Sequence, residues 1–192
     1  MSQQRQARTI TTTQFNQALE TAENLRHPFR NKVVLLLSFK AGLRAGEIAQ
    51  LDWRMLLDAN GKIGPTLNLP GIITKYGRAR RIPIHPDLRK ALLKLYRITG
   101  PEGPVILSER GNAMTAKSVV NWFKNIYDIT GLEGCSSHSG RRTFVTNAAR
   151  IIHKAGGSLR DVQLLAGHQS IITTQGYIDG DSDVQRKLVR LI

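Results

Sequence analysis

The sequence has little cysteine, no long apolar stretch and no sign of a secretion signal. A single cysteine, Cys135, excludes an internal disulfide framework and a cysteine-based zinc site. The longest apolar run, Val33 to Leu37, is far shorter than the ~20 residues that a membrane-spanning helix needs. The first residues, MSQQRQART, lack an apolar signal segment, so we expect no secretion, no membrane contact and a cytoplasmic location.

Acidic residues are also scarce. The 14 aspartates and glutamates stand against 28 lysines and arginines, which leaves a net charge of +14. A basic globular chain that is neither secreted nor membrane-bound most often binds nucleic acid. A ribosome-associated protein or a merely basic surface is the alternative, and the size of the charge favours nucleic acid.

The pattern of apolar residues predicts a mainly α-helical domain with a small antiparallel β-sheet, an α+β fold. The predicted helices cover about residues 13–26, 29–40, 42–53, 87–99, 115–130, 141–153, 158–166, 170–175 and 181–192. Three short runs, 66–70, 71–75 and 80–84, are suited to strands, with residues 76–78 as the hairpin tip between the last two. Without an internal repeat or a low-complexity linker, we expect one domain over residues 13–192 after a flexible arm over residues 1–12.

Reactive side chains gather toward the end of the sequence, in an order that makes little sense as core packing. They are His138, Arg141, His168 and Tyr177. An arginine can hold the anionic oxygens of a phosphodiester, histidines can donate hydrogen bonds or move protons, and a tyrosine hydroxyl can attack the phosphorus. Each residue alone is weak support, since a lone tyrosine is more often a partly buried aromatic.

Carboxylates are nearly absent from the same part of the chain. Between Cys135 and Tyr177 the only acid is Asp161, which forms a helix capping box with Ser158. A two-metal nuclease needs several convergent carboxylates, whereas guanidinium groups hold phosphate charge without a metal. We therefore expect no metal ion and no cofactor.

Two basic features lie earlier in the sequence. In GLRAGEIAQLDW, Arg44 and Glu47 lie one helical turn apart, so the carboxylate can orient the guanidinium; a weak surface ion pair is the alternative. Residues 75–81 are cationic and include no acid, which favours a DNA-facing edge over the protection of an edge strand. For Arg142 we expect a contact with the DNA backbone or with an acid. The residues expected at the DNA are Lys75, Arg78, Arg80, Arg81 and Arg142.

Taken in order, these motifs resemble the catalytic domain of the tyrosine recombinases, the phage integrase family. They are GLRxGE, a basic hairpin with a lysine, HxxRRTF, LAGHQS, and a tyrosine nine residues after the second histidine. The resemblance spans about Thr13 to Leu191. It implies that Lys75 protonates a departing 5′ oxygen and that Glu47 supports the first arginine. The implied catalytic residues are Arg44, Lys75, His138, Arg141, His168 and Tyr177.

The resemblance also implies how the other side chains act. Arg44 and Arg141 would hold the phosphate oxygens, and His168 would donate a hydrogen bond to them. His138 would contact the phosphate and help to deprotonate Tyr177, the nucleophile. A free tyrosine has a pKa of ~10, so it needs such help at neutral pH.

The implied function is site-specific recombination through a 3′-phosphotyrosine, with integration, excision or inversion of a DNA element. The covalent ester conserves the bond energy, so no nucleotide cofactor is implied. The implied partners are double-stranded DNA, a homo-tetramer formed from free monomers on paired sites, and accessory DNA-bending proteins; the protein would be nucleoid-associated. A non-cutting DNA-binding protein of this fold and a type IB topoisomerase-like enzyme are the alternatives, and the complete reactive set favours the recombinase.

The sequence departs from the family pattern at several points. Gly140 stands where many members have leucine, and Gly176 precedes the tyrosine where a larger polar residue is common. We expect no N-terminal core-binding domain, as in short recombinases similar to fimbrial switch invertases. The amphipathic tail over residues 181–192 is expected to dock on a neighbouring protomer, or else on its own domain.

Overall fold

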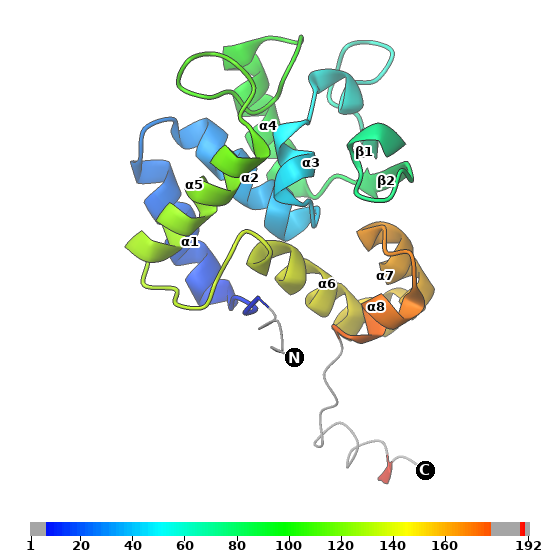
Figure 1. Ribbon diagram of the computed structural model, residues 1–192. Helices are drawn as coiled ribbons and strands as arrows, with labels where there is room; N and C mark the ends of the chain where they lie inside the picture. The colour runs from blue at the N-terminus through cyan, green and yellow to red at the C-terminus, as the bar shows by residue number, and fades with distance from the viewer. Residues whose placement is uncertain (1–6, 178–188, 191–192) are drawn as a thin grey trace.

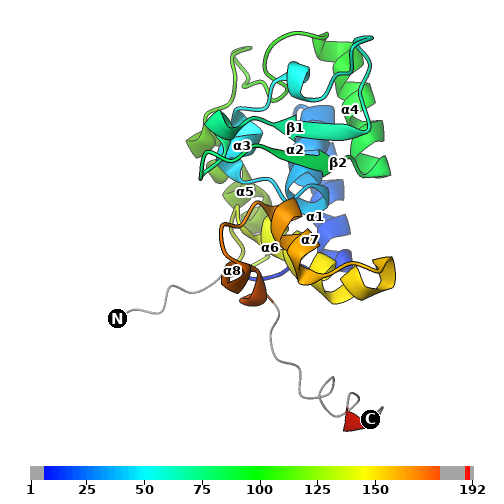
Figure 2. The same cartoon turned by 90° about the vertical axis from the view of Figure 1, so that its right-hand side faces the viewer.

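The computed structural model describes residues 7–177 and 189–190 and confirms a mainly helical fold with a two-stranded antiparallel sheet (Figures 1 and 2). Every helix among these residues is too short or too polar to cross a bilayer. The elements are, in chain order, α1 (Thr12–Asn24), α2 (Pro28–Lys40), α3 (Ala45–Ala49), η1 (Trp53–Met55), β1 (Thr66–Leu69), η2 (Gly71–Ile73), β2 (Arg80–Pro83), α4 (Pro86–Thr99), α5 (Ala116–Ile129), α6 (Ser139–Ile151), η3 (Ile152–Ala155), α7 (Leu159–Ala166) and α8 (Ile171–Gln175).

Side-chain caps explain where several helices begin. Thr11 and Gln14 form a capping box at the start of α1, so the first free backbone N–H groups are satisfied locally. Ser158 and Asp161 form the same arrangement at α7, as the sequence predicts. The proline at the first turn of α2 and of α4 fixes a helical backbone angle where no N–H donor is needed.

The sheet differs from its prediction. β1 pairs directly with β2 in antiparallel register, from Thr66 opposite Pro83 to Leu69 opposite Arg80. The predicted strand over residues 71–75 is wrong, because the chain turns sharply there into η2. At Gly71 an added Cβ would lie 2.3 Å from the carbonyl oxygen of Gly77, so the turn requires glycine. The hairpin loop therefore covers residues 70–79.

The described residues of the expected flexible arm, 7–12, differ from that prediction. Within the expected arm, Ile10 is buried and its N–H donates to Thr143 Oγ1 over 2.9 Å, so the described part of this segment is anchored on α6. The expected tail helix over residues 181–192 lies outside the described residues, except for residues 189–190.

Two hydrophobic clusters build the molecule. The larger one surrounds α2, in which all five residues of the run 33–37 are buried, and includes residues of α1, α3, α4, α5 and both strands. The smaller one is centred on Val145, Val162 and Ala166 and joins α6 and α7, with Tyr177 packed against it. In both views α6, α7 and α8 lie together below the sheet (Figures 1 and 2). The chain thus has a larger and a smaller packed part.

Helix α6 connects these two parts by packing closely on α2. A Cβ added to Gly140 would lie 2.3 Å from Ser38 Oγ and 2.8 Å from the ring of Phe39. A larger side chain would push α6 away from α2. Glycine at this position departs from the pattern of the family that the sequence resembles, and the close packing of α6 on α2 explains it in this chain.

Candidate active site

One open cleft of about 970 Å³ receives side chains from both packed parts. It brings together all six residues predicted to be catalytic, from the start of α3, the β1–β2 loop, the start of α6, the α7–α8 turn and the second residue after α8. They are Arg44, Lys75, His138, Arg141, His168 and Tyr177. None of the described residues that line this cleft is acidic. The cleft is therefore built to receive an anion.

Glu47 organises the wall that carries Arg44. Its carboxylate is 2% exposed and accepts three hydrogen bonds, from the Arg44 backbone N–H at 2.8 Å, from Arg44 Nη1 at 3.0 Å and from Arg80 Nη2 at 2.6 Å. Because the carboxylate ties down both the helix start and the guanidinium, Arg44 is held toward the cleft. The weak surface pair considered from the sequence does not fit this burial.

Arg141 is held by two backbone carbonyls. Its Nη1 donates to Gly42 O and its Nη2 to Ala166 O, both over 2.6 Å. Burial of the guanidinium and repulsion from Arg44 and Arg80 lower the pKa of Arg141 to about 9, and the charge of Glu47 opposes this shift. Arg141 is still protonated at neutral pH, and any anion in the cleft stabilises that charge.

His168 and Tyr177 form a stacked pair. Their ring centroids are 5.3 Å apart and their planes differ by 24°. The Nδ1 atom of His168 lies 3.0 Å from the hydroxyl of buried Thr174. Burial, followed by the charges of Arg141 and Arg44, lowers the pKa of His168 to about 4, so the ring is neutral at pH 7. If the Thr174 hydroxyl donates to Nδ1, the hydrogen of the neutral ring sits on Nε2.

His138 and Lys75 lie at the edge of the same cleft. Partial burial, and then the charge of Arg141, lowers the pKa of His138, so its ring is neutral at pH 7 and can accept a proton. Lys75 is exposed on the hairpin loop, with Nζ 5.4 Å from the centroid of the Tyr76 ring. The Arg44 guanidinium lies 5.9 Å from the same ring. Tyr76 thus links the loop to the arginine.

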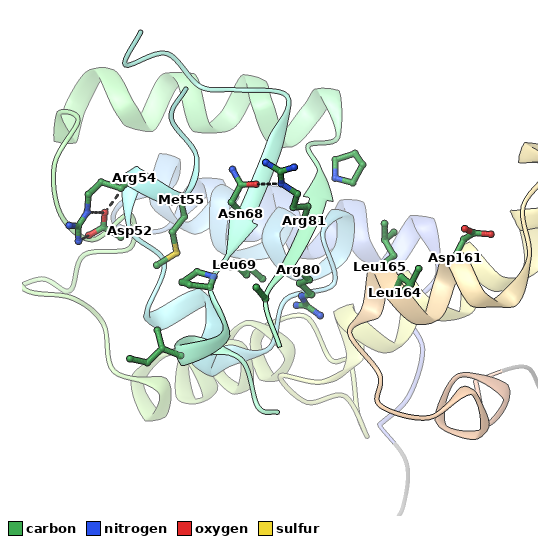
Figure 3. A pocket seen from close by; sticks show the side chains of 14 residues that line it. Asp52, Arg54, Met55, Asn68, Leu69, Arg80, Arg81, Asp161, Leu164 and Leu165 are labelled. Carbon is green, nitrogen blue, oxygen red and sulfur yellow. Dashed lines mark hydrogen bonds and ion pairs between the residues drawn. The ribbon is translucent and has the colours of Figure 1, made fainter. Parts of the chain in front are cut away.

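The residues expected at the DNA divide into two groups. Arg78 and Arg81 are exposed, and Arg81 Nε donates to Asn68 Oδ1 over 3.1 Å. The prediction that Arg80 contacts DNA is wrong. Its side chain is 6% exposed and points inward, where it donates to Glu47 and to the carbonyl oxygen of Ala166. Figure 3 shows Arg80 and Arg81 on opposite faces of β2, with Arg80 directed toward α7.

Arg142 lies beside the predicted nucleophile. Its guanidinium carbon is 5.5 Å from the centroid of the Tyr177 ring, in the range of a cation–π contact. The expected contact with DNA or with an acid stays a prediction. The ring of Tyr177 therefore contacts both His168 and a cation, and the Thr146 hydroxyl donates to its backbone carbonyl over 3.3 Å.

No group of three or more histidine, cysteine or carboxylate side chains is placed to hold a metal ion within residues 7–177 and 189–190.

Sequence reasoning missed several contributors to the cleft. The carbonyl groups of Gly42 and Ala166 orient Arg141, and backbone acceptors of this kind have no sequence signal. Thr174 carries a weak signal, since it lies three residues before the tyrosine, in the short helix that precedes it. Arg80 had a stronger one, because strand periodicity places it on the same face as the buried Ile82.

Comparison with known proteins identifies related chains. The model of the phage integrase family matches residues 8–183. The tyrosine recombinase XerC of Pelobacter propionicus is 26% identical over 159 residues, which cover 81% of this chain and 49% of the relative. The XerC of Erythrobacter litoralis is 30% identical over 181 residues, covering 93% of this chain and 55% of the relative. The chain thus spans about half the length of these curated relatives.

Solved structures share the fold. A Tn1549 transposon integrase in complex with transposon right end DNA superposes with a TM-score of 0.75 at 17% identity, over 99% of this chain and 67% of that one. The XerA recombinase superposes with a TM-score of 0.73 at 19% identity, over 95% and 64%. A λ integrase dimer bound to a COC′ core site gives 0.71 at 22% identity, over 93% and 49%.

Proposed function

The chain belongs to the phage integrase family, and on that premise we propose that it cuts and rejoins DNA at specific sites through a covalent 3′-phosphotyrosine. The observation that carries the proposal is the single cleft in which two arginines, two histidines, a lysine and Tyr177 meet from five separate segments. A phosphodiester is the substrate that can use all of them, because it offers anionic oxygens, an electrophilic phosphorus and a leaving alkoxide.

Arg44 and Arg141 would bind the non-bridging oxygens of the scissile phosphate. A guanidinium has five N–H donors, and the contacts to Glu47 and to the two carbonyls leave donors on both arginines for the phosphate. The neutral ring of His168 would donate a further hydrogen bond from Nε2 to one of these oxygens. Negative charge that develops on the oxygens in the transition state would meet donors already fixed in place.

Tyr177 would supply the nucleophile. Its Oη attacks the phosphorus and forms the new P–O bond while its proton passes to the neutral ring of His138. The bond between phosphorus and the 5′ oxygen breaks, and the ammonium group of Lys75 gives that oxygen a proton. The products are a 3′-phosphotyrosine and a free 5′ hydroxyl. Attack by a 5′ hydroxyl from another strand reverses these steps and releases Tyr177.

The DNA that flanks the coding sequence is first searched for inverted repeats, and a nicked suicide duplex built from such a repeat tests this proposal. Loss of the short strand beyond the cut prevents rejoining, so the wild-type protein should accumulate as a denaturation-resistant adduct with DNA. Tyr177→Phe should bind the same duplex with similar affinity and form no adduct, because only the attacking hydroxyl is removed. An adduct with the Phe variant would refute the assignment of the nucleophile. Binding without any wild-type adduct would favour a non-cutting DNA-binding protein.

Assembly on DNA is the second part of the proposal. We propose a monomer in the absence of DNA and a tetramer on two paired sites, which would associate the protein with the nucleoid. The λ integrase relative, solved as a dimer on a core site, supports assembly on DNA. Sedimentation with and without a full duplex site measures the change in mass. A tetramer in the absence of DNA would contradict it.

A further inference from the structure

We propose that Arg80 is a positioning residue that fixes the separation between the two arginines of the cleft. Its own side chain is buried and is not among the residues that line the cleft, so it acts through its neighbours. The inference rests on the proposed function, since the geometry that it protects is that of a phosphodiester site.

Arg80 bridges the two packed parts of the molecule. It belongs to β2, whose Ile82 is part of the larger hydrophobic cluster, and its Nη1 donates to the carbonyl of Ala166 in the smaller cluster. Arg141 makes the reciprocal bridge, from α6 to the carbonyl of Gly42 near the end of α2. The two guanidinium groups therefore connect the two parts, and only that of Arg141 lines the cleft.

Each of these contacts leads to a predicted catalytic arginine. The Arg80 Nη2 atom and Arg44 Nη1 donate to the two oxygens of one carboxylate, that of Glu47, at 2.6 and 3.0 Å. On the other side, Arg80 and Arg141 donate to the same carbonyl oxygen of Ala166. A shift of Arg80 would move the acceptor of either arginine, and Gly167 and His168 follow Ala166 directly.

The turn after α7 is shaped around the Arg80 guanidinium. Gly167 has a φ of +65°, and a Cβ there would lie 2.9 Å from Arg80 Nη1 and 3.0 Å from its Cδ. Both the backbone conformation and the space favour glycine at this position. The turn that presents His168 to the cleft is thus fitted to an arginine at position 80.

Arg80 is a poor choice if stability alone is required. Its Nε is buried without a hydrogen-bond partner among the described residues, and a buried donor without a partner destabilises the fold. Burial lowers the pKa of Arg80, and the nearby charge of Arg44 lowers it further. Replacing a whole buried ion pair with well-packed apolar side chains is often neutral or stabilising, so stability alone does not require the pair of Arg80 and Glu47. What a methionine cannot provide is the pair of directed bonds to Glu47 and Ala166.

Cleavage of two substrates separates alignment of the arginines from general destabilisation. One substrate is ordinary DNA, and the other carries a methylphosphonate at the scissile position, in either stereoisomer, so that one charged oxygen is removed. Arg80→Met should slow cleavage of ordinary DNA by about 10–100-fold, part of the loss expected when an oxyanion donor is removed outright. It should slow methylphosphonate cleavage by a much smaller factor. That substrate carries less negative charge at the phosphorus, so its cleavage depends less on the alignment of the two guanidinium groups.

Arg89→Met is the matched control. Arg89 also donates to two backbone carbonyls, of Ile63 and Gly64, but it lies on α4 and does not line the cleft. This variant should change stability and leave the ratio of the two cleavage rates as in wild type. Equal slowing of both substrates by Arg80→Met, at a temperature where all variants are folded, would overturn the proposal.

A measurement in the free protein keeps the test independent of activity. The Nε–H signals of Arg44 and Arg141 in ¹⁵N NMR spectra should both shift in Arg80→Met and stay in place in Arg89→Met. Unmoved signals would overturn the positioning role. If wild type forms no adduct with any duplex, the proposed function fails, and the NMR result still decides whether Arg80 links the two arginines.

Discussion

Replacing Glu47 with glutamine should destabilise the protein far more than removal of one surface ion pair. Both carboxylate oxygens are used: Oε1 accepts from Arg44 Nη1, and Oε2 accepts from the Arg44 backbone N–H and from Arg80 Nη2. A glutamine amide has one oxygen only. Whichever way it is turned, its NH₂ group faces at least one of these donors, and two guanidinium groups lose their counter-charge.

The burial of the network sets the magnitude. The side chains of Glu47 and Arg80 are 2% and 6% exposed, and that of Arg44 is 19% exposed. Removing one partner of a buried ion pair costs ~3–5 kcal/mol, because an uncompensated charge stays behind. For a domain of this size, ~1 kcal/mol corresponds to a shift in Tm of ~2–4 °C. We expect Glu47→Gln to lower Tm by roughly 6–20 °C.

Thermal and urea unfolding of the variant measure this effect, with Glu109→Gln as the matched control. Glu109 pairs with Arg26 at 3.1 Å, but the two side chains are 59% and 73% exposed. Such a pair contributes ~0–1 kcal/mol, and its loss should move Tm by at most a few degrees. Similar small losses in both variants would refute the view that Glu47 holds the cleft together.

Three further predictions concern the chemistry and its pH range. Arg44→Ala and Arg141→Ala should each slow adduct formation by about 10²–10³-fold, as for a lost oxyanion donor. EDTA should not inhibit the wild type, and full inhibition by EDTA would contradict the role of the arginines. Lys75→Ala should cleave a 5′-bridging phosphorothiolate at nearly the wild-type rate and ordinary DNA slowly, since a thiolate leaves without a proton; absence of rescue would assign the general acid to another group. The free energy of unfolding should fall as pH drops from 6.5 toward 4, because His168 binds a proton in the unfolded chain in this range and stays neutral in the folded protein. In urea titrations, His168→Gln should make this dependence on pH less steep.

Sequence periodicity predicted the helices well and the sheet less well. The helical pattern was sufficient because α1, α2, α4 and α5 each bury one face or all of their length in one cluster. The run over residues 71–75 has strand-forming residues, yet Ile72 is 91% exposed and the Thr74 hydroxyl donates to the carbonyls of Gly71 and Arg78. A contact between Gly71 and Gly77 across the loop decides the turn, and local propensity does not include it.

The candidate site was predicted from spaced motifs, and Glu47 was expected to support Arg44, but the other supporting groups were not predicted. The motifs identify the side chains that face the cleft, since those residue types are dictated by phosphate chemistry. They do not reveal that Arg80 turns away from the other cations of its loop, because a run of charge carries no direction. Strand alternation gives the direction once Ile82 is taken as buried, which places Arg80 inside and Arg81 outside.

The free protein carries an electrostatic cost that a phosphodiester would relieve. Arg44 and Arg80 both lie close enough to Arg141 to repel its charge, and Glu47 is the carboxylate that pairs with Arg44 and Arg80. The pKa of Arg141 is lowered first by burial of its guanidinium and then by this repulsion. A bound phosphate adds negative charge among the guanidinium groups and raises this pKa again. DNA with an intact scissile phosphate should therefore stabilise the fold more than the same duplex with a neutral methylphosphonate at that position, by an amount that falls when Arg141 is replaced.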